Sequence, residues 1–426
     1  MAIDTPATIV ILGAGPVAIE TALYARFLGY EVRLIERGEI GQSMRQWGHV
    51  RMFSPFSMNS SPLGLSALAA QDSERSLPEK DAILTANEFL DQYLVPLATS
   101  DLLSGSILTQ HEVIAVGRQQ LLKREAVGSS QRSETGFEVL VRNHERHEQV
   151  IQADIVIDCT GTFDHTNHVG SSGIPAIGEF ESRAQIEYRL PDILGNDRER
   201  YAAKQTLVIG SGYSAATNVC LLGKLAAESL ETHATWITRG ETSQDDQAEP
   251  SGPMSRIADD LLTERDHLAQ QANYLASSDD AHVTHWSKTT IEKIHYDAQG
   301  DHFQVTLSGE HAGTHTFDRV IANVGYRPDL SLYRELQVHQ CFASEGPMKL
   351  AAKLLGESSI NCLDQTSHGA ESLMTSEPNF YILGSKSYGR SSQFLISVGL
   401  DQIRELFSVI GDRAELNLYA PVVLPE

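Results

Sequence analysis

Two glycine-rich turns hold the residues of this chain best suited to binding phosphate groups. The first reads Gly13-Ala14-Gly15-Pro16-Val17-Ala18, and the second reads Gly210-Ser211-Gly212-Tyr213-Ser214-Ala215. Each follows a short apolar run, 8–12 or 206–209, and precedes a helix-like segment. The N–H groups and the dipole at a helix start attract a pyrophosphate, and glycines let it approach the backbone. Two such turns predict two bound dinucleotides, as when a nicotinamide passes electrons to a flavin.

The residues that follow the turns distinguish the two copies. Glu36 lies 23 residues after Gly13, where a carboxylate would accept hydrogen bonds from a ribose diol. Arg239 occupies the corresponding place after the second turn. An arginine would pair with a 2′-phosphate that a carboxylate would repel, which favours NADPH over NADH. The alternatives are a turn without a ligand and a surface arginine at a strand end.

One candidate for redox chemistry is the segment 47–56, which gathers aromatic, basic and hydroxyl side chains. If this segment runs beside a flavin, Trp47 would wall the ring system. His49 or Arg51 would then face the edge of the ring where negative charge develops on reduction. The alternative is a core turn whose histidine is hydrogen-bonded within the protein, because aromatic residues also suit a core.

A second candidate is the segment 364–397. His368 has an intrinsic pKa range that suits a proton shuttle, and a structural role in the core or at the surface is the alternative. The run that starts at Phe394 opens a helix whose N-terminus would face the same flavin edge.

The elements around these residues form one module written twice. The first copy predicts a helix over 16–28, strands over 31–35 and 155–157, and a meander of 112–121, 137–142 and 149–152. The second copy predicts helices over 215–230 and 255–276, strands over 234–238 and 319–322, and a meander of 282–296, 302–308 and 314–317. We therefore expect an α/β fold of two Rossmann-like, three-layer dinucleotide-binding domains, each with a β-meander. The nicotinamide domain, 190–316, would be inserted into a flavin domain made of 1–189 and 317–426.

Composition narrows the function classes. A chain of 426 residues should form two or three domains, and its formal charge of −23 argues against nucleic acid and anionic membranes as partners. No apolar run approaches the roughly 20 residues of a membrane span, and no signal peptide is expected. The four cysteines, Cys159, Cys220, Cys341 and Cys362, form no Cys-x-x-Cys pair and no zinc pattern. We expect a cytoplasmic protein without a metal site.

These motifs make the chain resemble the flavoproteins with two dinucleotide-binding domains, among them flavin-containing monooxygenases, amine N-hydroxylases and pyridine nucleotide-disulfide reductases. The resemblance also rests on Thr160-Gly161, on Gly325-Tyr326-Arg327-Pro328, and on Phe380-Tyr381-Ile382-Leu383-Gly384. Residues 41–47 resemble the segment along the flavin in the monooxygenase branch. The resemblance implies FAD at Gly13, Ala14, Gly15, Pro16, Val17, Ala18, Glu36, Arg37, Gln42, Val113, Thr160, Gly161, Gly384 and Phe394. It implies NADPH at Gly210, Gly212, Tyr213, Ser214, Ala215 and Arg239.

Three departures from that resemblance bear on the reaction. Ser385 follows Gly384 where the reductase branch has an aspartate, and the redox cysteine pair is missing. The monooxygenase fingerprint Phe-x-Gly-x-x-x-His is also missing, since the chain has Ile186-Glu187-Tyr188-Arg189-Leu190-Pro191-Asp192 in that region.

The predicted function is an FAD-dependent, NADPH-reduced oxidoreductase of the monooxygenase-like kind. It would use O2 to oxygenate a small amine or sulfur substrate, in a site dry enough to protect the reactive oxygen species. Two alternatives stay open: an NADPH-dependent reductase or dehydrogenase of a small molecule, and a redox-sensing flavoprotein without turnover. The resemblance also allows a homodimer.

Overall fold

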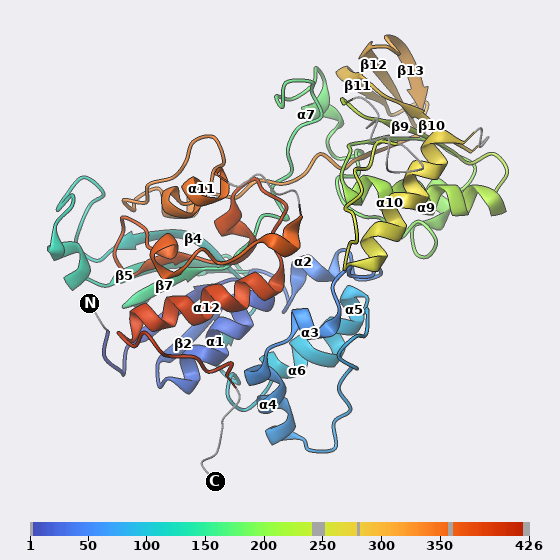
Figure 1. Cartoon of the computed structure of the whole chain (residues 1–426). Helices are drawn as coiled ribbons and strands as arrows, with labels where there is room; N and C mark the ends of the chain where they lie inside the picture. Colours follow the sequence, from blue (N-terminus) through green and yellow to red (C-terminus); the bar gives the residue numbers. More distant parts are fainter. Residues whose placement is uncertain (1–2, 241–251, 279–281, 357–360, 421–426) are drawn as a thin grey trace. The chain divides into compact units, whose positions relative to one another are not determined.

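The computed structural model describes residues 3–240, 252–278, 282–356 and 361–420. The chain divides into two compact units, Met1–His165 with Arg327–Glu426, and Thr166–Tyr326 (Figure 1). The second unit is therefore an insertion between two parts of the first.

The first unit is built on a parallel five-stranded sheet in the order β15-β7-β1-β2-β3. Its strands are β1 (Thr8–Leu12), β2 (Glu31–Ile35), β3 (Ile107–Leu108), β7 (Ile155–Asp158) and β15 (Phe380–Ile382). A separate antiparallel meander joins β4 (His111–Arg118), β5 (Phe137–Asn143) and β6 (Glu148–Ala153). Strands β1 and β7 are almost wholly buried, as expected for a parallel sheet that is covered on both faces.

Alternate residues of this sheet belong to two different cores. Ile9 and Ile11 pack with α1 (Pro16–Phe27) and α12 (Ile396–Ile410). Val10 and Leu12 pack with the meander. Because side chains alternate across a strand, helices, sheet and meander form three layers (Figure 1).

The remaining elements of the first unit are short. The helices are α2 (Gln42–Arg45), α3 (Phe56–Asn59), α4 (Pro62–Gln71), α5 (Ala86–Phe89), α6 (Val95–Ala98) and α11 (Met348–Leu354), with a π-helical turn, η1 (Leu90–Leu94), between α5 and α6. The 3₁₀ turns are η2 (Ser130–Glu134), η3 (Ser331–Tyr333), η4 (Cys362–Asp364), η5 (Ala370–Leu373) and η6 (Gly384–Tyr388). Within the described part of the chain, every helix is too short or too polar to cross a bilayer.

The second unit repeats the plan with a parallel sheet in the order β10-β9-β8-β14 and a meander in the order β11-β12-β13. Its strands are β8 (Gln205–Ile209), β9 (His233–Ile237), β10 (Val283–Trp286), β11 (Thr289–Asp297), β12 (His302–Gly309), β13 (Gly313–Phe317) and β14 (Arg319–Ala322). Its helices are α7 (Glu179–Ser182), α8 (Arg198–Tyr201), α9 (Tyr213–Glu228) and α10 (Thr263–Ser277). Val208 and Trp236 pack with α9 and α10, whereas Leu207 and Ile237 pack with the meander.

The predicted fold class is confirmed, and two predicted elements differ from the structure. The run 282–296 forms two strands, because Lys288 has a φ of 45° and breaks it into β10, in the parallel sheet, and β11, in the meander. The helix predicted over 255–276 begins only at Thr263. The preceding stretch folds back instead, and the Met254 N–H donates to Asn273 Oδ1 at 2.9 Å.

The unit boundaries also differ from the predicted 189/190 and 316/317. The stretch before β8 pairs with elements of the second unit, through Gly170 with Ile291 and Glu187 with Ile321. After the meander, β14 pairs with β8 rather than with the first sheet. The backbone hydrogen bonds of both stretches therefore place them in the second unit.

A carboxyl group is buried inside the first unit. Glu20 on α1 is 1% exposed, and Ser61 Oγ donates to its Oε2 at 2.8 Å. The Tyr93 hydroxyl donates to its Oε1. Burial raises the pKa of Glu20 from 4.5 to about 7, although the hydrogen bonds from Tyr93 and Ser61 act in the opposite direction.

This carboxyl predicts a pH-dependent stability. Because folding raises its pKa, Glu20 favours the folded state while protonated, and this contribution is lost as pH rises from 4.5 through about 7. Glu20→Gln, a mimic of the protonated form, should remove about 2–3 kcal/mol of the stability difference between pH 5 and pH 8.5 in urea unfolding. Glu31→Gln, at an exposed position of β2, is the control and should leave the pH profile unchanged. Parallel profiles for wild type and Glu20→Gln would contradict this assignment.

Candidate functional site

The first glycine turn connects β1 to α1 where space is tight. Gly13 has a φ of 97°, and a Cβ there would lie 3.0 Å from the Cys159 carbonyl oxygen. The Gly13 N–H donates to the Ile35 carbonyl at 2.7 Å. Two constraints therefore require glycine at this position: a left-handed backbone and the closeness of the neighbouring strand's end.

The start of α1 is open to an anion. Gly15 is the N-cap, Pro16 follows at the first helical position, and no side chain of the described residues caps the helix. A Cβ on Gly15 would meet no described atom within 4 Å. The first N–H groups of the helix can therefore bind a phosphate, with the helix dipole adding to the attraction.

Glu36 lies beside this turn at the end of β2. Its Oε2 accepts from the Ala14 N–H at 2.9 Å, and its Oε1 accepts from the Gly38 N–H at 2.8 Å. Burial raises the pKa of Glu36, and those backbone hydrogen bonds lower it by less, so the pKa lies above its ordinary value. Its carbonyl accepts from the His111 N–H at 2.9 Å, so the start of β4, two residues before Val113, lies against the same strand end.

Two further residues expected at FAD lie around the same turn. Arg37 is half exposed and forms an ion pair with Asp164. Gln42 starts α2 directly after Gly41, whose N–H donates to the Ala14 carbonyl at 2.9 Å. The segment after β2 therefore returns to the glycine turn.

The ends of β7 and β15 complete this edge of the sheet. A Cβ on Gly161 would lie 3.3 Å from Ser385 Oγ, so the Thr160-Gly161 turn contacts the residue after Gly384. Val17 lies 3.5 Å from a Cβ built on Gly384 and 2.7 Å from one built on Gly399. The starts of α1 and α12 therefore pack together at this edge.

Gln402 of α12 and Phe394, two residues before that helix, fix this junction. The Gln402 Oε1 accepts from the Gly384 N–H at 2.9 Å. The ring of Phe394 comes within 2.9 Å of a Cβ built on Gly399 and forms an edge contact with Tyr388, with centroids 5.4 Å apart. Phe394 thus packs at the junction, and its contact with the flavin stays a prediction.

A buried ion pair beneath this edge was missed by the sequence analysis. Lys386 Nζ lies 2.6 Å from Asp158 Oδ2, with both side chains fully buried, and donates to Thr160 Oγ1 at 2.9 Å. Asp158 Oδ1 accepts from the Thr160 hydroxyl at 2.7 Å. Thr160 and Lys386 are 226 positions apart. The sign in the sequence was a charged residue beside each of two glycine turns, Asp158 and Lys386, and that sign does not indicate that the two residues pair.

The candidate catalytic residues of 47–51 lie in different surroundings. Trp47 is half-buried against the first core. His49 Nε2 is enclosed and has no hydrogen-bond partner among the described residues. A role for His49 at the flavin stays a prediction. Arg51 is exposed and donates to the Ile83 carbonyl at 2.8 Å, which ties it to the neighbouring segment.

His368 lies on a separate segment. It has a φ of 61°, and its N–H contacts Thr366 Oγ1 at 3.3 Å. The neighbouring Ser367 donates to Glu405 of α12 at 2.6 Å. A proton-shuttle role for His368 stays a prediction.

The second unit builds an equivalent turn between β8 and α9. Gly210 has a φ of 130°, and a Cβ there would lie 2.2 Å from the Asn323 carbonyl oxygen. The indole of Trp236 donates to the Gly210 carbonyl at 2.7 Å. Gly212 is the N-cap, with no described atom within 4 Å of its Cβ position.

The residues after Gly212 form the first turn of α9. Tyr213, Ser214 and Ala215 are its first three residues, directly after the N-cap Gly212. Arg239 is exposed and comes directly after Thr238, whose backbone continues the β9 ladder. The helix start and the arginine therefore lie at the carboxyl edge of the same sheet.

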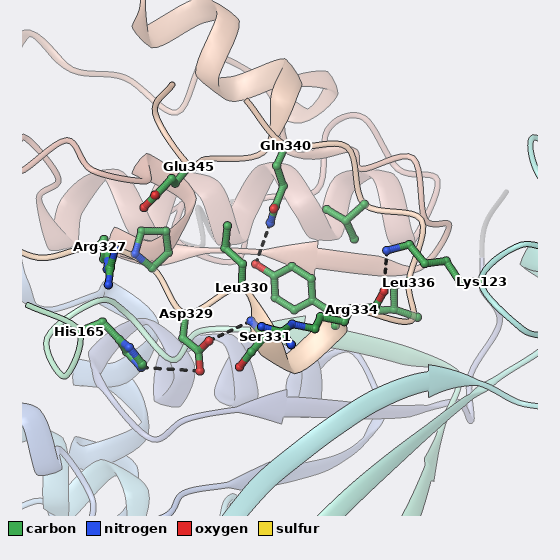
Figure 2. Close-up of a pocket in the computed structure, with 13 residues that line it drawn as sticks. Lys123, His165, Arg327, Asp329, Leu330, Ser331, Arg334, Leu336, Gln340 and Glu345 are labelled. Carbon is green, nitrogen blue, oxygen red and sulfur yellow. Dashed lines mark hydrogen bonds and ion pairs between the residues drawn. The ribbon is translucent and has the colours of Figure 1, made fainter. Parts of the chain in front are cut away.

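A polar pocket of about 430 Å³ adjoins the buried ion pair in the first unit (Figure 2). Asp329 lies within it and accepts from the Ser331 N–H at 2.8 Å, with His165 Nε2 3.6 Å away. Burial raises the pKa of Asp329, but Ser331 and the charges of His165 and Lys386 outweigh it and lower the pKa overall. The ring of Tyr333 separates this pocket from Lys386, 5.3 Å from the ring centroid.

Comparison with known proteins places this geometry in a family. The chain matches the pyridine nucleotide-disulphide oxidoreductases over residues 10–347. The chain belongs to this family. It is therefore an enzyme, an FAD-dependent oxidoreductase that uses a pyridine nucleotide, as the sequence predicted. None of the curated proteins compared shows significant similarity to it.

Solved structures share the fold at low sequence identity. The bacillithiol disulfide reductase of Bacillus cereus is 16% identical, with a TM-score of 0.65, and the match covers 96% of this chain and 100% of that one. The ornithine N-hydroxylase of Kutzneria sp. 744 is 15% identical (TM-score 0.60; 96% and 100%). The cadaverine monooxygenase of Erwinia amylovora is 12% identical (TM-score 0.62; 99% and 100%). Reductases and monooxygenases both share this architecture, so the fold does not choose between them.

The open N-caps predict a pair of separable variants. A Cβ at Gly15 or Gly212 would meet no described atom within 4 Å, and valine suits the extended backbone there, so both variants should fold. Gly15→Val would block phosphate approach in the first unit and lower FAD binding about tenfold or more. Gly212→Val should keep FAD and weaken the pyridine nucleotide instead.

Flavin absorbance per chain and calorimetric titration with NADPH measure the two effects. Gly117→Val is the control, because Gly117 lies on β4 with the same open surroundings and should keep both nucleotides. Loss of FAD in the Gly212 variant would refute the assignment.

Proposed function

We propose that the first unit binds FAD and the second binds NADPH. The observation that carries this is the open, uncapped helix start in each unit, with Glu36 beside the first and Arg239 beside the second. Both sites fit a pyrophosphate, because each N-cap glycine leaves room for it. When bound, the nicotinamide supplies a hydride and the flavin passes its electrons onward.

Within this assignment the chain's residues bind and orient. The N–H groups at the start of α1 bind the FAD pyrophosphate, and Glu36 accepts from the ribose hydroxyls in place of one of its present backbone donors. Thr160, held by Asp158 and Lys386, fixes the turn at the end of β7. His49 Nε2, enclosed without a partner among the described residues, is available to donate to a bound group.

The finer proposal is that the enzyme oxygenates a small amine or sulfur substrate. The four cysteines, all within the described part of the chain, form no disulfide. Burial raises the pKa of the Cys159 thiol and raises that of Cys220 to about 12, so neither provides a thiolate at neutral pH. The absence of a Cys-x-x-Cys pair from the sequence also argues against dithiol exchange and leaves O2 as the electron acceptor that needs no thiol. The ornithine and cadaverine enzymes with this fold support the substrate class.

One observation favours a reductase as the second candidate. Cys341 lies in a loop where hydrogen bonds from Ser344 and from the Ala343 N–H lower the pKa of its thiol. A single reactive thiolate could attack a disulfide substrate, forming a mixed disulfide and releasing one thiol, and the bacillithiol disulfide reductase of Bacillus cereus shares this fold.

Oxygen dependence distinguishes the two. With NADPH, O2 and a panel of primary amines and thioethers, we expect NADPH oxidation to rise with one substrate class and to yield oxygenated product, detected by mass spectrometry. Cys341→Ser should leave this turnover unchanged. With a low-molecular-weight disulfide as the substrate, NADPH turnover that is equal with and without O2 and is abolished in Cys341→Ser would establish the reductase instead. Hydrogen peroxide as the sole product with every amine and thioether would refute oxygenation.

Arg239 predicts the choice of nicotinamide. Arg239→Ala should raise the KM for NADPH about 10- to 100-fold, because a charged hydrogen bond to the 2′-phosphate is lost, and should change the KM for NADH less than about twofold. Arg189→Ala, another arginine of the same unit, is the control in the same steady-state assay. Equal effects of Arg239→Ala on both nucleotides would refute the preference.

A further inference from the structure

Three segments of the second unit meet beside Arg239, and the expected site does not include two of them. The Thr238 N–H donates to the Trp286 carbonyl at 3.1 Å, and the Lys288 N–H donates to the Gly240 carbonyl at 3.2 Å. The Glu310 N–H in turn donates to the Lys288 carbonyl at 3.3 Å. The end of β10 and the β12–β13 hairpin therefore lie at the same carboxyl edge as Arg239.

Arg239 follows β9 and lies between two backbone contacts with the next strand. Trp236 and Thr238 both contact His285, with the Trp236 and His285 ring centroids 5.3 Å apart and with Thr238 Oγ1 2.9 Å from His285 Nε2. Ile237 packs on the other face of β9, in the same core as Trp286. Because Thr238 bonds to Trp286 and Gly240 bonds to Lys288, Arg239 lies beside the end of β10 that carries Trp286.

Trp286 holds an imidazole beside the end of β10. The ring of His311 stacks on the indole with centroids 4.7 Å apart and an interplanar angle of 11°. His315 lies against the same indole at 5.0 Å, and its Nε2 is 3.3 Å from the His311 carbonyl. The stack fixes the position of a hairpin side chain that would otherwise be free to rotate.

Among the described residues, this edge bears the positive charges of Arg239 and Lys288 beside two imidazoles. Arg239, Lys288, His311 and His315 are its basic side chains, and Glu310 pairs with Lys288 at 3.4 Å. His285 does not add to this charge at neutral pH, since burial, and secondarily the charge of His311, lower its pKa to about 4. Positive groups around a strand end that already bears the expected 2′-phosphate arginine would bind a second face of the same phosphate.

We infer that His311 is a second contact for the 2′-phosphate of NADPH, and that Trp286 positions it. The inference rests on the proposed NADPH site and adds a determinant from the meander, more than 70 positions beyond Arg239. It makes discrimination between NADPH and NADH depend on two elements, the end of β9 and the β12–β13 hairpin.

The test measures binding of 2′,5′-ADP and of 5′-ADP to the FAD-loaded full chain by calorimetry. Both ligands lack the nicotinamide, so no turnover is involved. His311→Ala and Trp286→Ala should weaken 2′,5′-ADP about threefold to tenfold and change 5′-ADP less than about twofold, as expected for loss of a partly exposed charged contact. Trp286→Phe, which keeps a stacking ring, should restore most of the affinity.

His302→Ala is the matched control. His302 is an imidazole at the opposite end of β12, paired with Asp297, and its removal should leave both affinities unchanged. If Trp286→Ala does not fold, His311→Ala and Trp286→Phe decide the question.

The outcomes separate this inference from the proposed function. If Arg239→Ala weakens 2′,5′-ADP and His311→Ala does not, the His311 contact is refuted while the NADPH site stands. If neither variant weakens it, the NADPH assignment to the second unit fails. Equal weakening of 2′,5′-ADP and 5′-ADP in His311→Ala would also overturn the inference, because it would indicate a general structural defect.

Discussion

One steric constraint organises both units: the first strand of each sheet ends in a glycine pressed against the end of its neighbour. A Cβ on Gly13 would lie 3.0 Å from the Cys159 carbonyl oxygen, and a Cβ on Gly210 would lie 2.2 Å from that of Asn323. Only a residue without a side chain allows the chain to turn there with positive φ. That turn directs the start of α1 or α9 at the carboxyl edge of the sheet, where the helix dipole and free N–H groups favour an anion.

The two units stabilise the neighbouring strand end by different means. In the first unit, the fully buried pair of Asp158 and Lys386 joins the end of β7 to η6. The backbone carbonyl of Asp158 also accepts from the Leu383 N–H at 3.0 Å. In the second, the side-chain amide of Asn218 donates to Asn323 Oδ1 at 2.8 Å. A desolvated ion pair tolerates removal of neither partner, whereas an amide pair costs less to break. The edge with the ion pair is thus the more sensitive of the two to loss of a single partner.

The sequence predicted the turns, strands and helices that depend on local rules. The glycine turns, the strands β1, β8 and β14, and the helix that follows Pro16 all follow from apolar runs, glycine positions and helix-start preferences. The sequence did not predict contacts between distant segments. Lys386 offered no local sign of its pairing with Asp158, and the break at Lys288 depends on a backbone angle within an otherwise strand-like run. The position of the Arg51 side chain depends on its hydrogen bond to the Ile83 carbonyl, and no spacing rule could indicate that bond.

The same distinction explains why the entry of electrons is better defined than their destination. Phosphate binding needs backbone N–H groups and one or two charged side chains in a fixed turn, and short motifs record these directly. Chemistry at a flavin depends on side chains that come from segments far apart in sequence, and the proposed candidates Trp47, His49 and His368 belong to two such segments. His49 Nε2 illustrates the difference. Its enclosure without a partner among the described residues costs free energy that a bound group could offset, and that cost becomes visible only when the surrounding segments are in place.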